Sequence, residues 1–362
     1  MKKILVVGDG IDGSGLTEVI FNIFGDFKDK ITFVSYSDKK DLNVRKKCKV
    51  LSWKLVKAPV AAKNPIKHWI FWKKFFKENS FDIAYFNYSS SWNFLPVIFA
   101  KKSGIRKVVC HSHNSNYSHS FSSKSMMYLL NKINNIGKKE LKRYADVHIA
   151  TSLEAANWMF GTTENVFISK NGINLLRFKF NLSDRNQIRK KYNIKKEEKV
   201  VGMVGVLEER KNPFFALKVF EHLKVDNKKL VIIGKGSLER DLKLKIEKDK
   251  LEDKVIYISH SEEVNKWYSA FDLLLFPSLF EGLPLVMIEA QASGLSIIGS
   301  SNITNNAFLN SNVYRYDLHN VNGWVKKAEK LLEFPVRSNL NNNFKEYSSK
   351  YQSKNIKKII YN

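Results

Sequence analysis

The sequence predicts an α/β protein made of two Rossmann-like domains that face a cleft. Short apolar segments alternate with longer helical patterns along the chain, which is the rhythm of a parallel sheet joined by crossover helices. The alternation pauses at a polar and charged stretch, residues 181–199, and then starts again. A chain of 362 residues is too long for one ordinary core and suits two domains of about 180 residues each. We therefore expect two domains joined near residues 181–195.

Apolar segments on either side of this polar stretch are the expected strands. The helical patterns between them supply the crossovers that parallel strands need. The segments are residues 4–7, 31–34, 83–86, 108–109 and 147–150 in the first half, and 200–205, 230–234, 255–257 and 273–276 in the second.

Composition indicates a packed globular protein of a reducing compartment. Hydrophobic residues make up 44% of the chain, and no run of eighteen apolar residues occurs. Residues 1–8 read as a short strand that leads into glycines, not as a signal peptide. Cys48 and Cys110 form no Cys-x-x-Cys pair and no ligand cluster. We expect a cytoplasmic protein with neither a disulfide nor zinc.

The most informative segment is residues 276–298, FPSLFEGLPLVMIEAQASGLSII, which predicts a strand, a loop and a helix that starts at Leu285. Glu281 lies in the loop and Glu289 about one turn into the helix. The backbone N–H groups of a helix start suit a diphosphate, and a carboxylate can accept hydrogen bonds from both hydroxyls of a vicinal diol. A helix start and an early glutamate also occur in α/β proteins for structural reasons alone.

The flanks of the two glutamates resemble the donor-site signature of the retaining GT-B glycosyltransferases, glycosyltransferase family four or group 1, of the bacterial capsule and exopolysaccharide type. The match includes the strand, both glutamates, the turn and the Ala-Gln-Ala-Ser-Gly that follows. The resemblance implies that Glu281 lies beside the transferred sugar and that Glu289 holds the ribose. The turn that it assigns to the sugar hydroxyls consists of Gly282, Leu283, Pro284 and Leu285.

A second phosphate-side feature follows the strand at 200–205. Gly205 makes a turn, and Arg210 and Lys211 come just before a helix start at Asn212-Pro213. Two adjacent cations there can neutralise a diphosphate leaving group, although such pairs are common in so basic a chain. The segment is similar to the family's glycine, arginine, spacer, lysine, asparagine pattern, but Val206 stands where the family has arginine. We expect Arg210 to compensate.

In the first half, His111 and His113 follow the strand at 108–109. We expect the two histidines, separated by one residue, to point to opposite sides of an extended chain, so that only one of them faces the cleft. The carboxyl edge of a parallel sheet is where open α/β folds bind ligands. In the family a histidine followed by Asp or Asn lies near the transferred sugar and acceptor, and His113-Asn114 matches it. Zinc is the weaker alternative, because no nearby ligand completes a tetrahedral site.

Gly8, Gly10 and Gly13 follow the first strand like the glycines of a dinucleotide site, but only scattered charges stand about twenty residues later, where such a site has its ribose-binding acid. A flexible turn that approaches the donor phosphates or the acceptor is the better interpretation. The family has a glycine pair here, to which Gly13 and Gly15 correspond with Ser14 inserted. Residues 152–155 and 171–174 also fit the family, so the resemblance extends from residue 1 to about residue 305.

The net charge of +26 is concentrated in the first half, where residues 1–180 carry 30 lysines and arginines against 13 acidic residues. No nucleic-acid-binding motif accompanies this charge, so we expect no nucleic-acid partner. Residues 63–77 and 124–143 mix lysines with aromatic and aliphatic residues, which favours an anionic membrane surface. The alternative is that both segments are ordinary helices packed on the sheet.

The resemblance implies an N-terminal acceptor-side domain over residues 1–180 and a nucleotide-sugar-binding domain over 181–340. Residues 341–362 form a C-terminal helix or tail that packs back on the first domain. The implied reaction transfers a hexosyl or N-acetylhexosaminyl unit, with retention, from a UDP-sugar to a glycan or lipid-linked acceptor in capsular, exopolysaccharide or other cell-surface glycan synthesis. Its catalytic residues are His113, Arg210, Lys211 and Glu281.

The resemblance also implies that the diphosphate departs on the front face of the sugar, so that no enzymatic nucleophile is needed. The chain contains no Asp-x-Asp pair, so we expect no metal and no other cofactor. Three alternatives stay open: a catalytically silent nucleotide-sugar-binding subunit of a partner transferase, a sugar-nucleotide epimerase of the same fold, and a basic nucleic-acid-binding protein.

Overall fold

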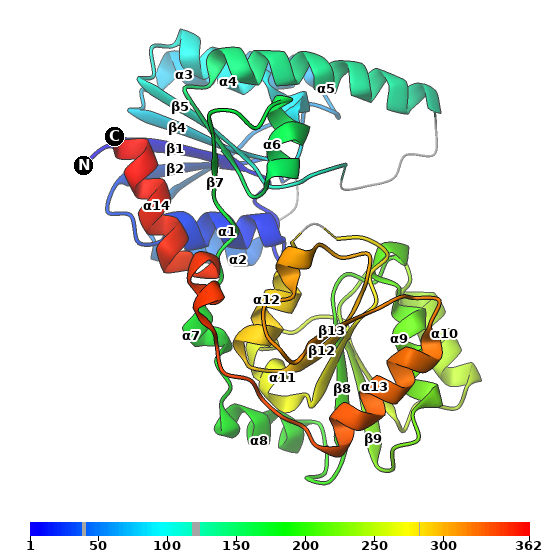
Figure 1. Cartoon of the computed structure of the whole chain (residues 1–362). Helices are drawn as coiled ribbons and strands as arrows, with labels where there is room; N and C mark the ends of the chain where they lie inside the picture. The colour runs from blue at the N-terminus through cyan, green and yellow to red at the C-terminus, as the bar shows by residue number, and fades with distance from the viewer. Residues whose placement is uncertain (38–40, 118–123, 282) are drawn as a thin grey trace. The chain divides into compact units, whose positions relative to one another are not determined.

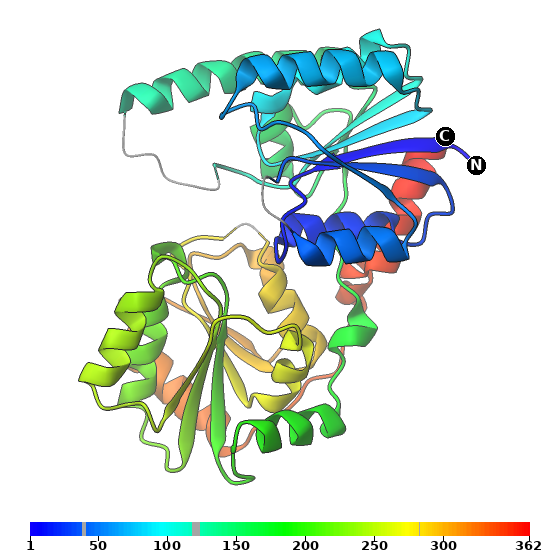
Figure 2. The same ribbon diagram turned by 180° about the vertical axis from the view of Figure 1, so that it is seen from behind.

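The computed structural model describes residues 1–37, 41–117, 124–281 and 283–362, and divides them into two compact units. Unit 1 consists of Met1–Gly172 with Glu346–Asn362, and unit 2 of Ile173–Lys345. Each unit holds its own parallel sheet with helices on both faces (Figures 1 and 2). The predicted fold class, two Rossmann-like α/β domains, is confirmed.

The sheet of unit 1 has seven strands in the order β3-β2-β1-β4-β5-β6-β7. Neighbouring strands are all parallel, and the order reverses between β1 and β4. Ligands of open α/β sheets bind at the carboxyl edge beside such a reversal. The strands are β1 (Lys3–Gly8), β2 (Lys30–Ser35), β3 (Lys54–Lys57), β4 (Ile83–Tyr88), β5 (Lys107–Ser112), β6 (Val147–Ala150) and β7 (Val166–Ile168).

Two layers of helices cover this sheet. One layer packs Trp72, Leu141 and Phe160 into a core against Val108; its helices are α3 (Pro65–Glu78), α4 (Leu95–Lys102), α5 (Lys124–Tyr144) and α6 (Leu153–Phe160), with the short 3-10 helix η1 (Ser91–Asn93). The other layer consists of α1 (Gly15–Phe24), α2 (Leu42–Val50) and α14 (Ser349–Tyr361) (Figure 1).

The C-terminal helix α14 belongs to unit 1 and packs against α1. The Ser353 hydroxyl donates to the carbonyl of Ile23 at 2.6 Å, and the Gln352 side chain accepts from the Gly172 amide at 2.8 Å. Gly172 fits there because a Cβ would lie 2.7 Å from backbone atoms of Ser349. The chain therefore leaves unit 1 at a glycine that its own last helix holds.

Unit 2 has six strands in the order β10-β9-β8-β11-β12-β13, again all parallel. They are β8 (Lys199–Val204), β9 (Lys228–Ile233), β10 (Val255–Ile258), β11 (Leu273–Phe276), β12 (Ser296–Ser300) and β13 (Val313–Tyr316). The helices α9 (Pro213–His222), α10 (Glu239–Lys248) and α13 (Val321–Glu333) pack on one face around the buried Trp324.

The remaining helices of unit 2 are α7 (Leu175–Phe178), α8 (Leu182–Lys191), α11 (Val264–Ala270) and α12 (Leu285–Ala292), which contact one another. Short 3-10 helices are η2 (Glu209–Lys211), η3 (Asn305–Ala307) and η4 (Asn342–Tyr347). Among the described residues, no helix is both long and apolar enough to cross a bilayer.

Residues 181–195, predicted as the join between domains, are largely helical and lie inside unit 2. Asn181 caps α8 by accepting from the Asp184 amide, and α8 packs on α11. The units divide instead at Gly172 and at Lys345, against the predicted 180 and 340. The polar sequence misleads because α8 is fixed by its arginines and buries only Ile188 and Arg189.

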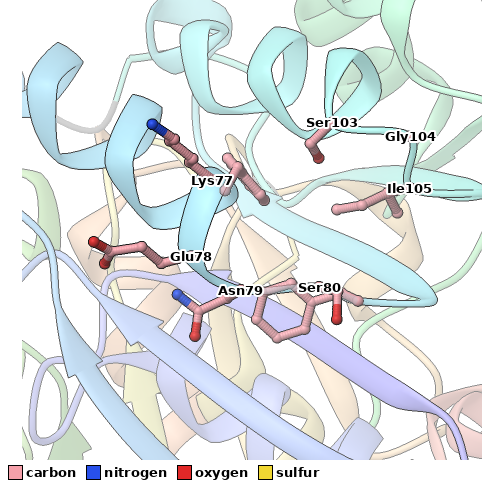
Figure 3. Close-up of a pocket in the computed structure, with 9 residues that line it drawn as sticks. Lys77, Glu78, Asn79, Ser80, Ser103, Gly104 and Ile105 are labelled. Atoms are coloured by element: carbon pink, nitrogen blue, oxygen red, sulfur yellow. The ribbon is translucent and has the colours of Figure 1, made fainter.

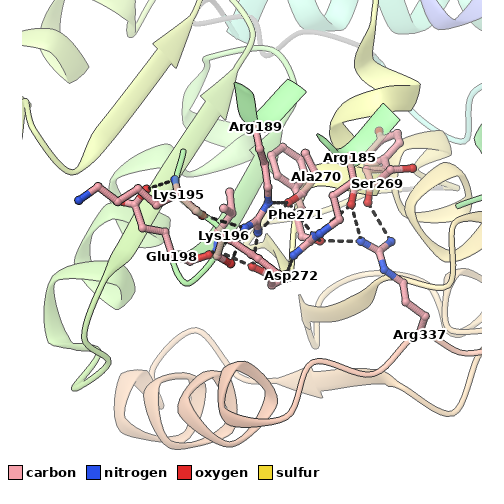
Figure 4. A network of polar contacts seen from close by, with 12 residues as sticks. Arg185, Arg189, Lys195, Lys196, Glu198, Ser269, Ala270, Phe271, Asp272 and Arg337 are labelled. Carbon is pink, nitrogen blue, oxygen red and sulfur yellow. Dashed lines mark hydrogen bonds and ion pairs between the residues drawn. The ribbon is translucent and has the colours of Figure 1, made fainter. Parts of the chain in front are cut away.

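Three arginines enclose the end of α11 (Figure 4). Arg185 and Arg189 each donate at 2.7 Å to one oxygen of Asp272, whose side chain also accepts from the Val200 amide at 2.8 Å. Arg337 donates to the carbonyls of Tyr268, Ser269 and Phe271. These carbonyls have no partner within the helix, and the negative end of a helix dipole favours cations. Burial, together with repulsion from Arg185, lowers the pKa of Arg337 to about 9.

The first prediction concerns Asp272, the acidic member of this network. In Asp272→Ala, Arg185 and Arg189 keep their charges without the carboxylate, and we expect the free energy of unfolding of unit 2 to fall by about 3–5 kcal/mol. Urea denaturation followed by tryptophan fluorescence measures the change. The matched control is Asp249→Ala, which removes a half-exposed (i,i+4) pair with Lys245 and should cost about 0.5 kcal/mol or less. Equal losses in the two variants would contradict this account.

Candidate functional site

The loop between β11 and α12 carries the predicted signature. It leaves β11 after Phe276, and Glu281 forms an isolated parallel bridge with Ile303 before α12 begins at Leu285. The prediction of a strand, a loop and a helix starting at Leu285 is confirmed. Pro284 is the N-cap residue of α12, and Leu283 lies beside it in the loop. Gly282, which the sequence assigned to the sugar hydroxyls, lies outside the described residues.

Glu281 is brought together with both predicted cations. One of its carboxylate oxygens lies 2.5 Å from the Lys211 ammonium and 2.5 Å from the Arg210 guanidinium. The side chain of Glu281 is only 10% exposed and that of Lys211 only 11%. Burial lowers the pKa of Lys211, while the neighbouring Glu281 acts in the opposite direction. The cluster is a largely buried carboxylate held between two cations.

Arg210 also pairs with Glu208, whose carboxylate oxygen lies 2.7 Å from its second guanidinium nitrogen. The centroid of the Phe280 ring lies 5.8 Å from the guanidinium carbon of Arg210. Val206, which occupies the place of the family's arginine, is 51% exposed. Arg210 therefore contacts the same carboxylate as Lys211, although it follows Val206, which occupies the position of the family's arginine.

Two glycine turns lie at the carboxyl ends of β8 and β9, next to this cluster. Gly205 has φ +155° and the Lys211 side chain lies beside it. Gly234 has φ +145°, and a Cβ there would lie 1.8 Å from the Gly205 carbonyl oxygen. Both turns thus need glycine, and the N–H groups of Gly205 and Gly234 donate to the carbonyls of Ile233 and Ile258.

Glu289 makes a different contact. It lies in the second turn of α12 and accepts at 2.9 Å from the hydroxyl of Tyr268, a buried residue of α11. Burial, together with the charge of Glu289, raises the pKa of Tyr268 well above its usual value. Tyr268 is a site residue that the sequence analysis missed, because nothing in the local pattern links α11 to α12.

In unit 1, His113 follows the end of β5 and is half-buried. The Asn87 amide is anchored because its nitrogen donates to the Val7 carbonyl at 3.1 Å, so its oxygen faces Nε2 of His113 at 3.0 Å. The Asn171 side chain lies 3.1 Å from Nδ1. Both ring nitrogens of His113 thus face amide oxygens, Oδ1 of Asn171 and Oδ1 of Asn87, and burial lowers the pKa of His113 to about 4.

His111 and His113 do not lie apart as the extended-chain argument predicted. Their ring centroids are 4.0 Å apart, because residues i and i+2 of an extended chain lie on the same face and only the residue between them points the other way. His111 is fully buried and its Nδ1 lies 2.9 Å from the Tyr85 hydroxyl oxygen, whereas His113 is half-buried. The described residues contain no cluster of three or more metal-ligating side chains.

The turn after β1 is held by Asp9. Its carboxylate accepts from the hydroxyls of Ser14 and Thr17, both at 2.6 Å. Gly13 has φ +76° with open space around it, and Gly15 is the first residue of α1. Asn114, the partner of His113 in the sequence match, is half-buried, and its carbonyl accepts from Ser112. The turn is therefore ordered by acidic side chains rather than freely flexible.

A pocket of 410 Å³ in unit 1 lies away from the predicted site residues (Figure 3). Residues 79–81, which precede β4, and 103–105, which precede β5, line it. It therefore opens at the amino edge of the sheet, whereas His113 lies at the carboxyl edge. None of the predicted site residues lines it.

The chain is similar in sequence to known glycosyltransferases. Residues 184–351 match the family model for glycosyl transferases group 1. Over 313 residues the chain is 28% identical to EpsF of Bacillus subtilis (strain 168), whose glycosyltransferase assignment is provisional; the match covers 84% of this chain and 80% of EpsF. It is 24% identical over 277 residues, 75% of this chain and 71% of the other, to the UDP-Gal:alpha-D-GlcNAc-diphosphoundecaprenol alpha-1,3-galactosyltransferase of Escherichia coli.

Solved glycosyltransferase structures have the same fold. HepE of Anabaena, in complex with UDP and glucose, superimposes with a TM-score of 0.78 over the full length of both chains, at 14% identity. WaaG, a glycosyltransferase involved in lipopolysaccharide biosynthesis, gives 0.67 over 99% of each chain at 14% identity. The predicted GT-B fold is thus confirmed.

The second prediction follows from the paired histidines. Their pKa values are lowered by burial, to about 4 for His113 and well below the usual value for His111, so between pH 6.5 and 4 the unfolded chain binds more protons than the folded protein. Stability should therefore fall as the pH falls through this window, by up to about 1.4 kcal/mol per pH unit for each histidine.

Unfolding midpoints measured at several pH values test this. His113→Asn removes one of the two groups, so its pH dependence in this window should be visibly shallower than that of the wild type, whatever its absolute stability. Parallel profiles for the two proteins would show that His113 titrates normally.

Proposed function

We propose that the protein is a retaining glycosyltransferase that moves a hexosyl or N-acetylhexosaminyl unit from a UDP-sugar to a sugar hydroxyl. The observation that carries the proposal is the placement of Glu281 between Lys211 and Arg210 beside the glycine turns of β8 and β9. Two cations suit a diphosphate, and a carboxylate can accept hydrogen bonds from the hydroxyls of a sugar.

In this proposal the two cations stabilise the leaving diphosphate. As the bond from the anomeric carbon to the phosphate oxygen breaks, negative charge grows on that oxygen, and Lys211 and Arg210 bind it more strongly than in the ground state. The departing oxygen takes the acceptor proton on the same face, which gives retention without an enzymatic nucleophile. We also propose that no metal is needed, because these side chains supply the positive charge.

Glu281 and Glu289 have separate roles in this scheme. Glu281 lies beside the transferred sugar, where the turn formed by Leu283, Pro284 and Leu285 contacts its hydroxyls. Glu289 accepts from the ribose hydroxyls, and the Tyr268 hydroxyl fixes the rotamer of its carboxylate. Orientation by a buried partner of this kind reduces the entropy lost on binding.

We assign His113 to sugar positioning in unit 1. Its low pKa keeps the ring neutral near pH 7, so it acts as a hydrogen-bonding group rather than as a cation. Asn114 and the turn of Gly13, Ser14 and Gly15 are proposed to approach the acceptor or the donor phosphates.

The acceptor is proposed to be a glycan or a lipid-linked sugar in the synthesis of capsular, exopolysaccharide or other cell-surface polysaccharide, at the cytoplasmic side of the membrane. Support comes from the Escherichia coli relative, whose name specifies a diphosphoundecaprenol-linked acceptor. A silent nucleotide-sugar-binding subunit is the second candidate, and exposed Val206 in place of an arginine favours it.

The third prediction tests the donor site by ligand-induced stabilisation. UDP at a hundred times its dissociation constant should stabilise the protein by about 2.7 kcal/mol and raise its thermal midpoint. Glu289→Ala should lose this shift because it removes the ribose acceptor. Glu333→Ala, which removes an exposed glutamate from α13, is the matched control and should retain it. No shift with UDP, GDP or ADP would contradict the proposal.

The fourth prediction separates catalysis from binding. Lys211→Ala should slow release of UDP from the UDP-sugar by about 10²- to 10³-fold, the usual effect of losing one preorganised charge-stabilising group. Lys218→Ala, an exposed lysine on the neighbouring helix α9, should leave the rate unchanged. A nucleotide-release assay measures both. A wild-type protein that binds UDP but turns over no UDP-sugar with any acceptor tested would identify the silent subunit instead.

A further inference from the structure

The outer face of α3 and α5 in unit 1 presents apolar and basic side chains together. We call this the α3/α5 surface. Its apolar members are between 42% and 71% exposed, and its basic members are exposed as well. The apolar members are Ile66, Trp69, Ile70, Tyr128, Leu129 and Ile136; the basic members are Lys67, Lys73, Lys77, Lys132, Lys139, Lys142 and Arg143.

Both helices lie in one layer. Each contacts α4, and the Trp69 and Phe99 rings of α3 and α4 lie 6.3 Å apart, edge to face (Figures 1 and 2). The inner side of α5 is fixed by Asn134, which binds Ser91 at 2.6 Å, and by Gly137, where a Cβ would lie 2.0 Å from the Ser91 carbonyl oxygen. Leu129, Ile136 and Arg143 lie on the opposite side of that helix.

Packing of the core does not account for this surface. The inner face of α3 already buries His68, Trp72, Phe75 and Phe76. Ile66, Trp69 and Ile70 come in addition, in the first turns of the same helix, and expose apolar area to solvent. Exposed apolar side chains gathered in neighbouring turns of one helix are a feature of interaction surfaces.

The charge is equally one-sided. α3 has four lysines and one glutamate, and α5 has five lysines, one arginine and one glutamate. Lys74 pairs with Glu78 at 3.6 Å. Within the part of the chain that the structure describes, the seven basic members of the surface form no ion pair. Lys73 and Lys132 instead lie over the rings of Trp69 and Tyr128, at 4.8 and 4.7 Å from their centroids.

We propose that the α3/α5 surface binds the headgroup region of an anionic lipid bilayer. Aromatic and aliphatic side chains enter the interface between headgroups and acyl chains, and the surrounding lysines contact lipid phosphates, which is the pattern of helices that lie in a membrane surface. Lysine stems can also follow the apolar surface while their ammonium groups stay at headgroup level.

Charge decides between this occupant and the others. A second copy of the chain would bring the same positive surface against itself in a two-fold dimer, which is repulsive. Nucleic acid would satisfy the cations but leave Ile66, Ile70 and Leu129 without an apolar partner. An anionic bilayer satisfies both sets of side chains.

Vesicle co-sedimentation tests the proposal with the full chain. The wild type should bind vesicles of phosphatidylglycerol and phosphatidylcholine, bind phosphatidylcholine alone weakly, and release as salt is raised. Replacing Lys73, Lys139 and Arg143 by Gln should weaken binding about a hundredfold, at about fivefold for each cation lost. Trp69→Ser with Ile70→Ser should weaken it about tenfold or more.

Matched controls come from unit 2, where Lys218→Gln with Lys248→Gln and, separately, Leu244→Ser change exposed residues of α9 and α10. These variants should bind vesicles like the wild type. The UDP-induced shift in thermal midpoint is measured in every variant, because it reports on unit 2 and does not depend on lipid. If the triple variant fails to fold, the Trp69→Ser, Ile70→Ser variant decides.

Several results would overturn the proposal. They are absence of binding to anionic vesicles, equal binding to phosphatidylcholine alone, equal losses in the control variants, or a wild-type dimer that the α3/α5 variants dissociate. The last result would assign the surface to a second copy. Because the UDP shift is read separately, loss of vesicle binding with a normal shift leaves the transferase proposal intact, and the converse leaves the membrane proposal intact.

Discussion

The buried charge cluster at the end of α11 is the constraint on which unit 2 depends. α11 has only seven residues, too few to be stable alone, and its terminal carbonyls would be buried without partners. Arg185, Arg189 and Arg337 provide those partners, and Asp272 balances part of their charge while accepting from the first residues of β8. The same cluster therefore links α8, α11 and the starts of β8 and β11 to one another. Since Tyr268 lies on α11, it also determines where Glu289 is held.

The parallel sheet converts this scaffold into a site. Because all strands of unit 2 run in one direction, their carboxyl ends bring Gly205, Gly234 and the loop of Glu281 to a single edge, whereas the arginine cluster occupies the amino edge. The arginine cluster and the candidate site thus lie at opposite ends of the strands. At the carboxyl edge, the largely buried Lys211 shares one carboxylate oxygen of Glu281 with Arg210. In the proposed reaction a diphosphate must therefore compete with Glu281 for both cations.

The sequence could predict what is encoded locally. The run 273–276, the turn and the helix at Leu285 are correct because a buried strand and a helix start have strong local patterns. The strands β3, β7, β12 and β13 were not predicted. β3 is an edge strand that begins and ends with lysine and is at most half-buried. β13 is also an edge strand, and it contains the exposed Arg315. The pairs of Tyr268 with Glu289 and of His113 with Asn87 bring together separate elements, so spacing along the chain carries no sign of them.

Arg210 is proposed to take the role that the family pattern gives to an arginine at the position of Val206. Val206 follows the glycine turn and points no charge at the site, but the 3-10 helix η2 returns the chain so that Arg210 reaches Glu281. The same guanidinium is held by Glu208, so a bound diphosphate must compete with that carboxylate for it. Two phosphate groups carry more charge than one carboxylate and accept several hydrogen bonds at once, which makes the exchange favourable. In the proposed reaction, compensation by Arg210 therefore requires that Glu208 release its guanidinium.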